Sequence, residues 1–132
     1  MSTKSVAEKL GIKPNTTIWS SHESRLTLIG RLPTGVRSVA APDEASTALV
    51  FADDAASLRA ILGPHRDRLT RAEAFWVAYP KGNRADINRD SLWPILADHG
   101  MRPISQVAID EVWSALRFRP LKNGEPPFTG RR

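Results

Sequence analysis

Two uninterrupted apolar stretches constrain the fold of this chain more than any other feature. "TALVFADD" (47–54) and "AEAFWVAYP" (72–80) are apolar almost throughout and rich in strand-forming residues. Strands with one solvent-facing side alternate apolar and polar residues, whereas continuous apolar runs are typical of strands covered on both faces. Between the two runs, Leu58, Ile61 and Leu62 recur at helical spacing. We therefore predict a parallel sheet with helices on both of its faces.

The remaining segments extend this pattern. Asp53 or Asp54 can cap the helix after the first apolar run, and Gly63-Pro64 should interrupt that helix. A later helix should begin near Asp90 or Ser91, because Pro94 is tolerated only within a first turn. Other helices are expected over about 5–10 and 24–30, and other strands over about 16–19, 36–40 and 104–109.

The last expected strand differs from the others. In "SALRFRP" (114–120), Leu116 and Phe118 alternate with arginines, which indicates one wet face. It follows the preceding strand too closely for a parallel crossover, so the two should pair antiparallel. The predicted fold class is α/β: a single three-layer Rossmann-like domain, residues 1–119, with a mostly parallel sheet and a terminal antiparallel strand. Residues 120–132 hold three prolines and two glycines and are expected to form a flexible basic tail.

Charge and composition exclude several classes of function. The net charge of +5 lies mostly in residues 117–132, which carry five basic side chains and one acidic side chain. The rest of the chain is nearly neutral, so nucleic-acid binding is judged unlikely and would depend mainly on the tail. The chain has no cysteine, no paired histidine spacing and no long apolar segment. We therefore expect no disulfide, no metal site, no membrane span and a soluble, cytoplasmic protein.

The first strand runs into a turn that raises a question about cofactors. In nucleotide-binding α/β folds this turn is rich in glycine, so that backbone can approach the phosphates. Here it reads Ser20-Ser21-His22-Glu23. These are triad residue types, but neighbours in sequence do not make a triad, and a turn with a helix cap is the simpler interpretation. The sequence therefore predicts that no cofactor is bound in the usual way.

Two blocks of sequence resemble a known family. "KLGIKPNTTI" (9–18) and the late stretch 75–118, which begins "FWVAYPK" and ends "IDEVWSALRF", are similar to a small, mostly actinobacterial family of unknown function. That resemblance implies a fold and no activity. The layout of the chain also distantly resembles class I methyltransferases, which bind S-adenosylmethionine through a Gly-rich turn and hold the ribose with an acid after the second strand. That resemblance implies Asp43 or Glu44, which follow Pro42 in a loop, as stand-ins for the ribose acid.

The candidate ligand site lies where parallel strands end. Ligands of open α/β sheets bind beyond the carboxyl ends of the strands. Lys81 follows one such strand, and Asp110 and Glu111 follow a strand expected beside it. Lys81, Arg84 and Asn88 would suit an anionic group, with Trp113 as an apolar wall. Alternatively, Lys81 and Arg84 pair with Asp86, Asp110 or Glu111 in a structural network, and Trp76 and Trp113 belong to the core.

The sequence interpretation favours a non-catalytic binding or regulatory module over an enzyme. No nucleophile, metal set or phosphate loop is evident, and the partner would be a small anionic ligand or another protein. The alternatives are a small-ligand or nucleotide binder, including a reduced methyltransferase-like enzyme, and a nucleic-acid adaptor acting through the tail. A second copy could also pair with the exposed end strand to form a homodimer.

Overall fold

A six-stranded sheet forms the centre of the protein, in the order β2-β1-β3-β4-β6-β5. The computed structural model describes residues 6–30, 32–69, 72–81, 87, 89–97 and 100–120. The first four strands in this order run parallel, and β6 pairs antiparallel with both β4 and β5. The predicted α/β class and the terminal antiparallel pairing are confirmed. The strands are β1 (Thr17–Ser20), β2 (Arg37–Ser38), β3 (Thr47–Phe51), β4 (Ala74–Pro80), β5 (Met101–Ala108) and β6 (Trp113–Pro120).

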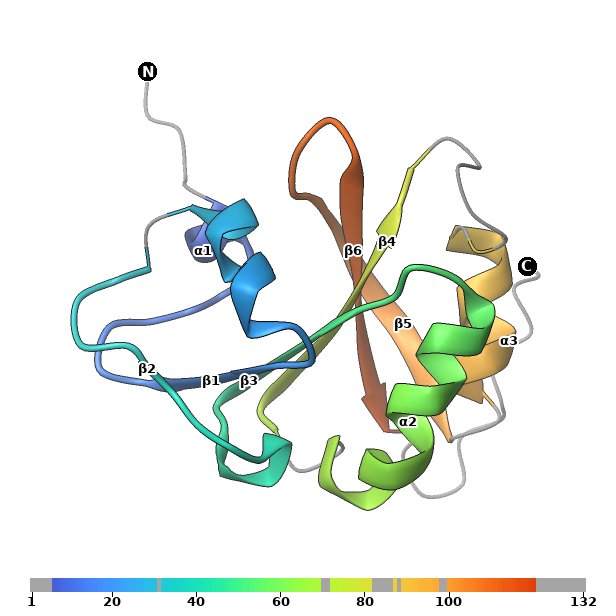
Figure 1. Cartoon of the computed structure of the whole chain (residues 1–132), viewed down its shortest axis with the longest axis horizontal. Helices are drawn as coiled ribbons and strands as arrows, with labels where there is room; N and C mark the ends of the chain where they lie inside the picture. The colour runs from blue at the N-terminus through green and yellow to red at the C-terminus, as the bar shows by residue number, and fades with distance from the viewer. Residues whose placement is uncertain are drawn as a thin grey trace.

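Helices cover both faces of the sheet, as the apolar runs predict (Figure 1). Successive side chains of a strand point to opposite faces, and β4 shows this directly. Phe75 and Val77 pack in the core beneath α2 and α3, whereas Trp76 and Ala78 pack in the core beneath α1 and η1. All five residues of β3 and all seven of β4 are buried. The helices are α1 (Val6–Lys9), α2 (Ala55–Leu69) and α3 (Arg89–Ala97), with 3₁₀ helices η1 (Glu23–Ile29) and η2 (Pro42–Glu44).

The short helix α1 is fixed to the sheet at its end. Gly11 adopts a φ of 80° and donates its N–H to the carbonyl of Glu8, which terminates the helix. The indole Nε1–H of Trp76 donates to the carbonyl of Leu10 over 3.1 Å. Trp76 is 2% exposed, so this hydrogen bond connects α1 to the middle of β4 inside the core.

Several predicted boundaries are wrong. Pro64 does not interrupt α2, which continues to Leu69 around it, because one lost backbone hydrogen bond is tolerated in a helix packed against a sheet. Helix α3 begins at Arg89, so Pro94 lies beyond the first turn. The segment expected as a helix over 24–30 is the 3₁₀ helix η1. Strand β2 is shorter and strand β5 longer than expected.

The order of the strands indicates where a ligand would bind, namely at the carboxyl ends of β1 and β3. From β1 the chain turns to β2 on one side and then crosses to β3 on the other, so the crevice between the ends of β1 and β3 is a topological switch point. The expectation that β5 lies beside β4 is wrong, because β6 lies between them. No helix among the described residues is long and apolar enough to cross a membrane. The predicted tail lies outside the described residues from residue 121 onward.

Candidate functional site

The turn after β1 closes over the switch point with side chains instead of bare backbone. The hydroxyl of Ser20 accepts a hydrogen bond from the N–H of His22 over 3.1 Å. The hydroxyl of Ser21 accepts from the N–H of Phe51 over 2.8 Å and lies 2.9 Å from Nδ1 of His22. The serines therefore satisfy backbone donors at the ends of β1 and β3. This supports the interpretation of the stretch as a turn, but the predicted helix cap is wrong, because His22, the N-cap of η1, makes no side-chain capping hydrogen bond.

An ion pair joins the segments that follow β1 and β3 next to this turn. Nη1 of Arg25, in η1, lies 2.9 Å from Oδ1 of Asp53, and Nη2 lies 3.1 Å from Oδ2. Only the Nη2 contact is a hydrogen bond, because Nη1 is buried and has no hydrogen-bond partner within the described part of the chain. The side chains are 29% and 46% exposed, so the carboxylate and part of the guanidinium group remain accessible to a ligand, although Nη1 itself is buried. Sequence reasoning missed this pair, although Asp53 follows a buried strand directly.

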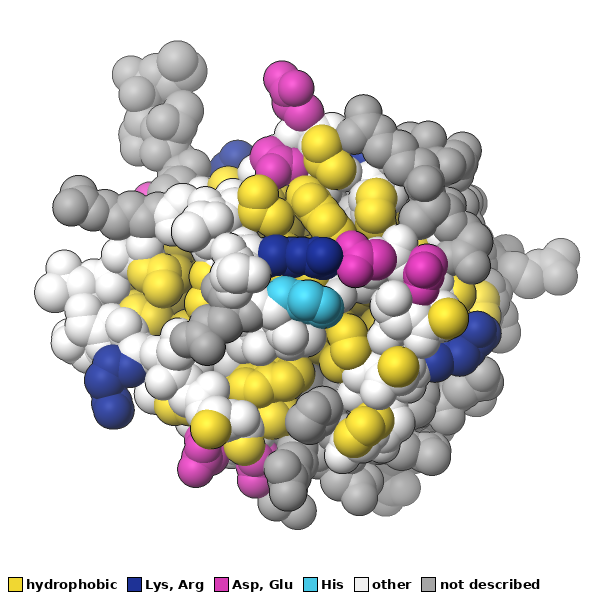
Figure 2. Space-filling view, viewed as in Figure 1, with side chains coloured by type: hydrophobic (Ala, Val, Ile, Leu, Met, Phe, Trp, Pro, Cys, Tyr) yellow, Lys and Arg dark blue, Asp and Glu magenta, His cyan; other side chains and the backbone are white. Residues whose placement is uncertain are grey.

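Aromatic rings surround the guanidinium group. The Cζ atom of Arg25 lies 5.3 Å from the ring centroid of Trp113 and 6.0 Å from that of Phe51. The two rings meet edge to face at 5.5 Å, and His22 makes a similar contact with Phe51 at 6.5 Å. Figure 2 shows basic, acidic and histidine side chains gathered on this face beside hydrophobic ones. We call Arg25, Asp53, Phe51, Trp113 and His22 the switch-point cluster.

Asp54 has a different role from Asp53. Its Oδ1 accepts a hydrogen bond from the backbone N–H of Ser57 over 2.7 Å, which makes it the N-cap of α2. Hydrogen bonds from the backbone N–H and then the hydroxyl of Ser57 lower the pKa of Asp54, because they stabilise the carboxylate. Of the two aspartates left open by the sequence, Asp54 therefore caps the helix, and Asp53 is left for the ion pair.

The residues predicted as a ligand site are only partly brought together. The N–H of Lys81 donates to the carbonyl of Val112 over 2.7 Å, so the end of β4 meets the β5–β6 hairpin. Oδ1 of Asp110 accepts from the N–H groups of Val112 and Trp113 over 2.8 and 2.7 Å. Asp110 thus holds the hairpin turn, and Glu111 is exposed beside it. Trp113 joins the switch-point cluster.

Two predicted site residues, Arg84 and Asn88, lie outside the described residues, as does Asp86 of the alternative network. Within the described ranges, the ion-pair network expected for Lys81 is not formed with Asp110 or Glu111, and no three potential metal ligands gather. The exposed acids proposed for ribose binding lie at the wrong edge. The carbonyl of Glu44 accepts the hydroxyl of Thr17 at the start of β1, which places Asp43 and Glu44 at the amino edge of the sheet.

Comparisons with known proteins identify the fold. No protein-family model matches the chain, and no curated protein sequence matches it. Among solved structures, a protein of the NADB-Rossmann superfamily from Streptococcus agalactiae has a TM-score of 0.57 and 12% identity, covering 98% of this chain and 72% of its own. A Streptococcus pneumoniae protein assigned as a tRNA (m1A22) methyltransferase, in complex with S-adenosyl-L-methionine, gives 0.57 and 12%, covering 98% and 76%. The m1A22 tRNA methyltransferase of B. subtilis gives 0.53 and 11%, covering 92% and 68%.

These similarities correct the interpretation of function drawn from sequence. The Rossmann-like fold and the distant methyltransferase-like layout are confirmed, whereas the resemblance to an actinobacterial family finds no support. The prediction of a non-catalytic module is wrong in the light of these neighbours, which are described as methyltransferases. The expectation against nucleic acid is likewise unsupported, because the same neighbours act on tRNA. At 10–12% identity, the fold is what the likeness shows for this chain.

Proposed function

We propose that this protein is a methyltransferase-like protein that binds S-adenosylmethionine, or a closely similar sulfonium nucleoside, at the switch-point cluster. The observation that carries the proposal is the partly exposed Arg25–Asp53 pair at the carboxyl ends of β1 and β3. The amino-acid part of S-adenosylmethionine is a zwitterion. A guanidinium and a carboxylate side by side are its electrostatic complement.

The fit of the ligand differs from the usual mode of binding. The turn after β1, residues 20–23, has no glycine, and Ser21 there binds the N–H of Phe51. Ala40 and Ala41 come shortly after β2, where an acid would hold a ribose. We therefore assign recognition to side chains instead of the backbone cradle. Arg25 would hold the carboxylate of the ligand, Asp53 would hold its ammonium group, and Trp113 would form the wall for the sulfonium cation.

Residues around the proposed ligand would fix its charged partners in place and exclude water from it. Ser21 and Phe51 join the ends of β1 and β3, which keeps Arg25 and Asp53 at a fixed separation. A bound sulfonium nucleoside supplies a methyl group to an acceptor nucleophile, which gives up a proton. The aromatic rings of Phe51 and Trp113 would exclude water on one side of that ligand.

Isothermal titration calorimetry of the full chain tests the proposal with matched ligands. S-adenosylmethionine and S-adenosylhomocysteine should bind, whereas methylthioadenosine, which lacks the amino-acid part, should bind about 10-fold or more weakly. Arg25→Ala should cause a similar loss. Arg59→Ala, an exposed arginine on α2, is the matched control and should leave affinity unchanged. Equal affinity for all three ligands, or no heat with any of them, would contradict the proposal.

We further propose RNA as the class of methyl acceptor. The support is the description of two structural neighbours as tRNA methyltransferases and the concentration of positive charge in residues 117–132. Replacing Lys122, Arg131 and Arg132 by Gln should weaken retention of a tRNA transcript and reduce its salt dependence. Replacing Arg37 and Arg59, both exposed on the folded body, should have the smaller effect. Tail variants that retain tRNA as well as the unmodified chain would remove RNA from the proposal.

A further inference from the structure

A hollow lies at the opposite edge of the sheet from the switch point. It has a volume of about 220 Å³ and opens where β3 and β4 begin, beside the segment that follows α1. That volume is below the range of drug-sized ligand sites, roughly 300–1,000 Å³, and suits a small molecule or a single functional group. The hollow is lined by Leu10, Gly11, Lys13, Thr16, Ser46, Thr47, Glu73, Ala74 and Arg117.

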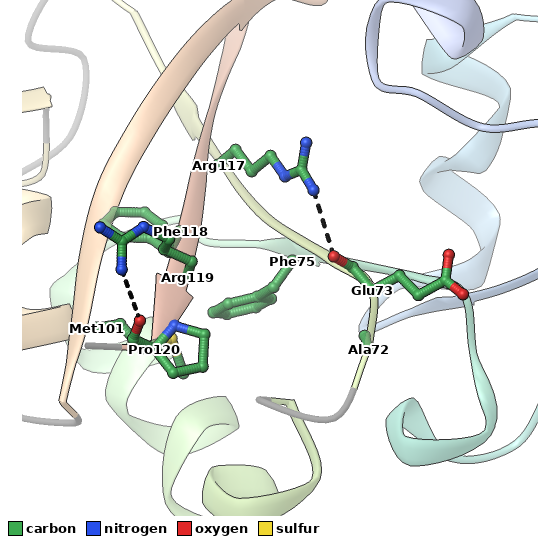
Figure 3. Close-up of a pocket in the computed structure, with 8 residues that line it drawn as sticks. All are labelled: Ala72, Glu73, Phe75, Met101, Arg117, Phe118, Arg119 and Pro120. Carbon is green, nitrogen blue, oxygen red and sulfur yellow. Dashed lines mark hydrogen bonds between the residues drawn. The ribbon is translucent and has the colours of Figure 1, made fainter. Parts of the chain in front are cut away.

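The charged side chains of this amino-edge hollow are two cations and one acid. Figure 3 is a close-up of a different pocket that shares two lining residues with this hollow, and it shows the guanidinium of Arg117 contacting the backbone carbonyl of Glu73 while the carboxylate points away. The contact from Nη2 of Arg117 to that carbonyl oxygen is 3.3 Å long. Arg117 is therefore held in place by a neutral group, and Glu73 does not neutralise it. Lys13 lines the same hollow as a second positive charge.

One polar atom in the wall of the hollow is left without a partner. The Nε atom of Arg117 is buried and has no hydrogen-bond partner within the described part of the chain. A buried donor without an acceptor is unfavourable, and an arginine presents its donors in a planar fork that matches phosphate oxygens. Because Nε is buried, an oxygen of a bound anion satisfies this donor only when the side chain of Arg117 turns toward the hollow. The half-buried hydroxyl of Ser46 is a further donor on the wall of the hollow.

We propose that the amino-edge hollow binds the phosphate group of a small molecule, with Lys13 and Arg117 as its cationic ligands. Lys13 acts as a point charge and Arg117 as a planar donor. The site is at the edge of the sheet opposite the switch-point cluster, so the proposal does not depend on the proposed function. A sugar phosphate is the class of ligand that matches both the charge and the volume.

Amide chemical shifts of the full-length protein test this site. Titration with ribose 5-phosphate at constant ionic strength should move the signals of Gly11, Ser46 and Ala74 and saturate. Ribose without phosphate should move none of them. Lys13→Ala should lower the affinity about 10-fold. Lys9→Ala, an exposed lysine on α1 outside the hollow, should bind as the unmodified chain does.

The outcomes separate the proposal from simpler explanations. Identical shifts with chloride would show general ionic binding and overturn the site, as would a Lys13→Ala variant with unchanged affinity. Shifts produced only by a short oligonucleotide would assign the hollow to a phosphodiester backbone and overturn the small-molecule ligand. Arg117→Lys keeps the charge and loses the planar fork, so partial retention of affinity is expected. Lys13 is exposed and outside the core, so Lys13→Ala should fold normally. It therefore tests the site even if Arg117 variants fold poorly.

Discussion

Arg25 and Asp53 join the carboxyl ends of two strands that are neighbours in the sheet although the residues are 28 positions apart in the chain. The pair lies across the switch point, where the chain leaves β1 in one direction and returns to β3 in the other. Stability of the sheet does not require a charged pair there, because β1 and β3 are already joined by three residue pairs of their ladder. We attribute the pair to ligand recognition for that reason.

A double-mutant cycle with Arg25→Ala and Asp53→Ala should confirm that the pair contributes little to folding. The side chains are partly exposed, so their coupling energy in urea denaturation should be below about 1 kcal/mol. Arg25→Ala alone should cost more than Asp53→Ala, because it also removes contacts with two aromatic rings that are worth about 0.5–1 kcal/mol at exposed sites. A coupling energy of several kcal/mol would assign the pair a structural role instead.

The fold could be predicted from sequence because its main signals are local. Continuous burial in β4 and the alternation in β6 follow directly from their residue patterns. The position of β6 between β4 and β5 could not be predicted, because hydrophobic patterns determine which segments are strands and not which strands are neighbours. Asp110 and Glu111 are therefore expected near Lys81 for an incorrect reason, because the strand beside β4 is β6 and not β5.

The candidate site was harder to predict because it is assembled from three separate segments. Arg25 comes from η1, Asp53 follows β3, and Trp113 begins β6. Of these three residues, only Trp113 belongs to the ligand site predicted from sequence. That predicted site is centred on Lys81 and Asp110 instead of Arg25 and Asp53. The available signal was an aspartate directly after a buried strand, but Asp53 and Asp54 are adjacent, and only hydrogen-bond geometry separates the cap from the ion pair.

The cap of α2 predicts a specific dependence on pH. The pKa of Asp54 is lowered in the folded protein, so its contribution to stability is fully present above the ordinary aspartate pKa of about 3.9. That contribution should be lost as the pH falls through the lowered folded-state value. Ser57→Ala removes one of the two donors, so NMR titration should show the pKa of Asp54 moving part of the way back up. An Asp54 titration that is unchanged in Ser57→Ala would show that the backbone donor alone sets the pKa.

Two glycines with nearly equal φ angles should resist alanine for different reasons. Gly30 combines a φ of 78° with a ψ of −155°, a region that essentially only glycine adopts, so alanine is strained there by about 1–3 kcal/mol. At Gly35, which has a φ of 79°, the added Cβ would overlap the side chain of Asn15, whereas nothing lies within 4 Å at Gly30. Thermal unfolding should therefore show a loss of stability for both variants. An unchanged melting temperature for Gly35→Ala would mean that Asn15 moves aside at little cost.

Trp76→Phe should destabilise the protein through the carbonyl of Leu10. The substitution removes the indole donor and leaves that buried acceptor without its 3.1 Å hydrogen bond, which costs about 1–3 kcal/mol. Because this bond connects α1 to β4, hydrogen exchange should increase most at Leu10 and Ile12, whose amides are bonded within the α1 turn. Ile18→Val, at a residue buried in the same core, is the control and should lower stability without that selective increase. Uniform exchange across the sheet in Trp76→Phe would show that the indole acts by filling volume, and that its hydrogen bond does not anchor α1.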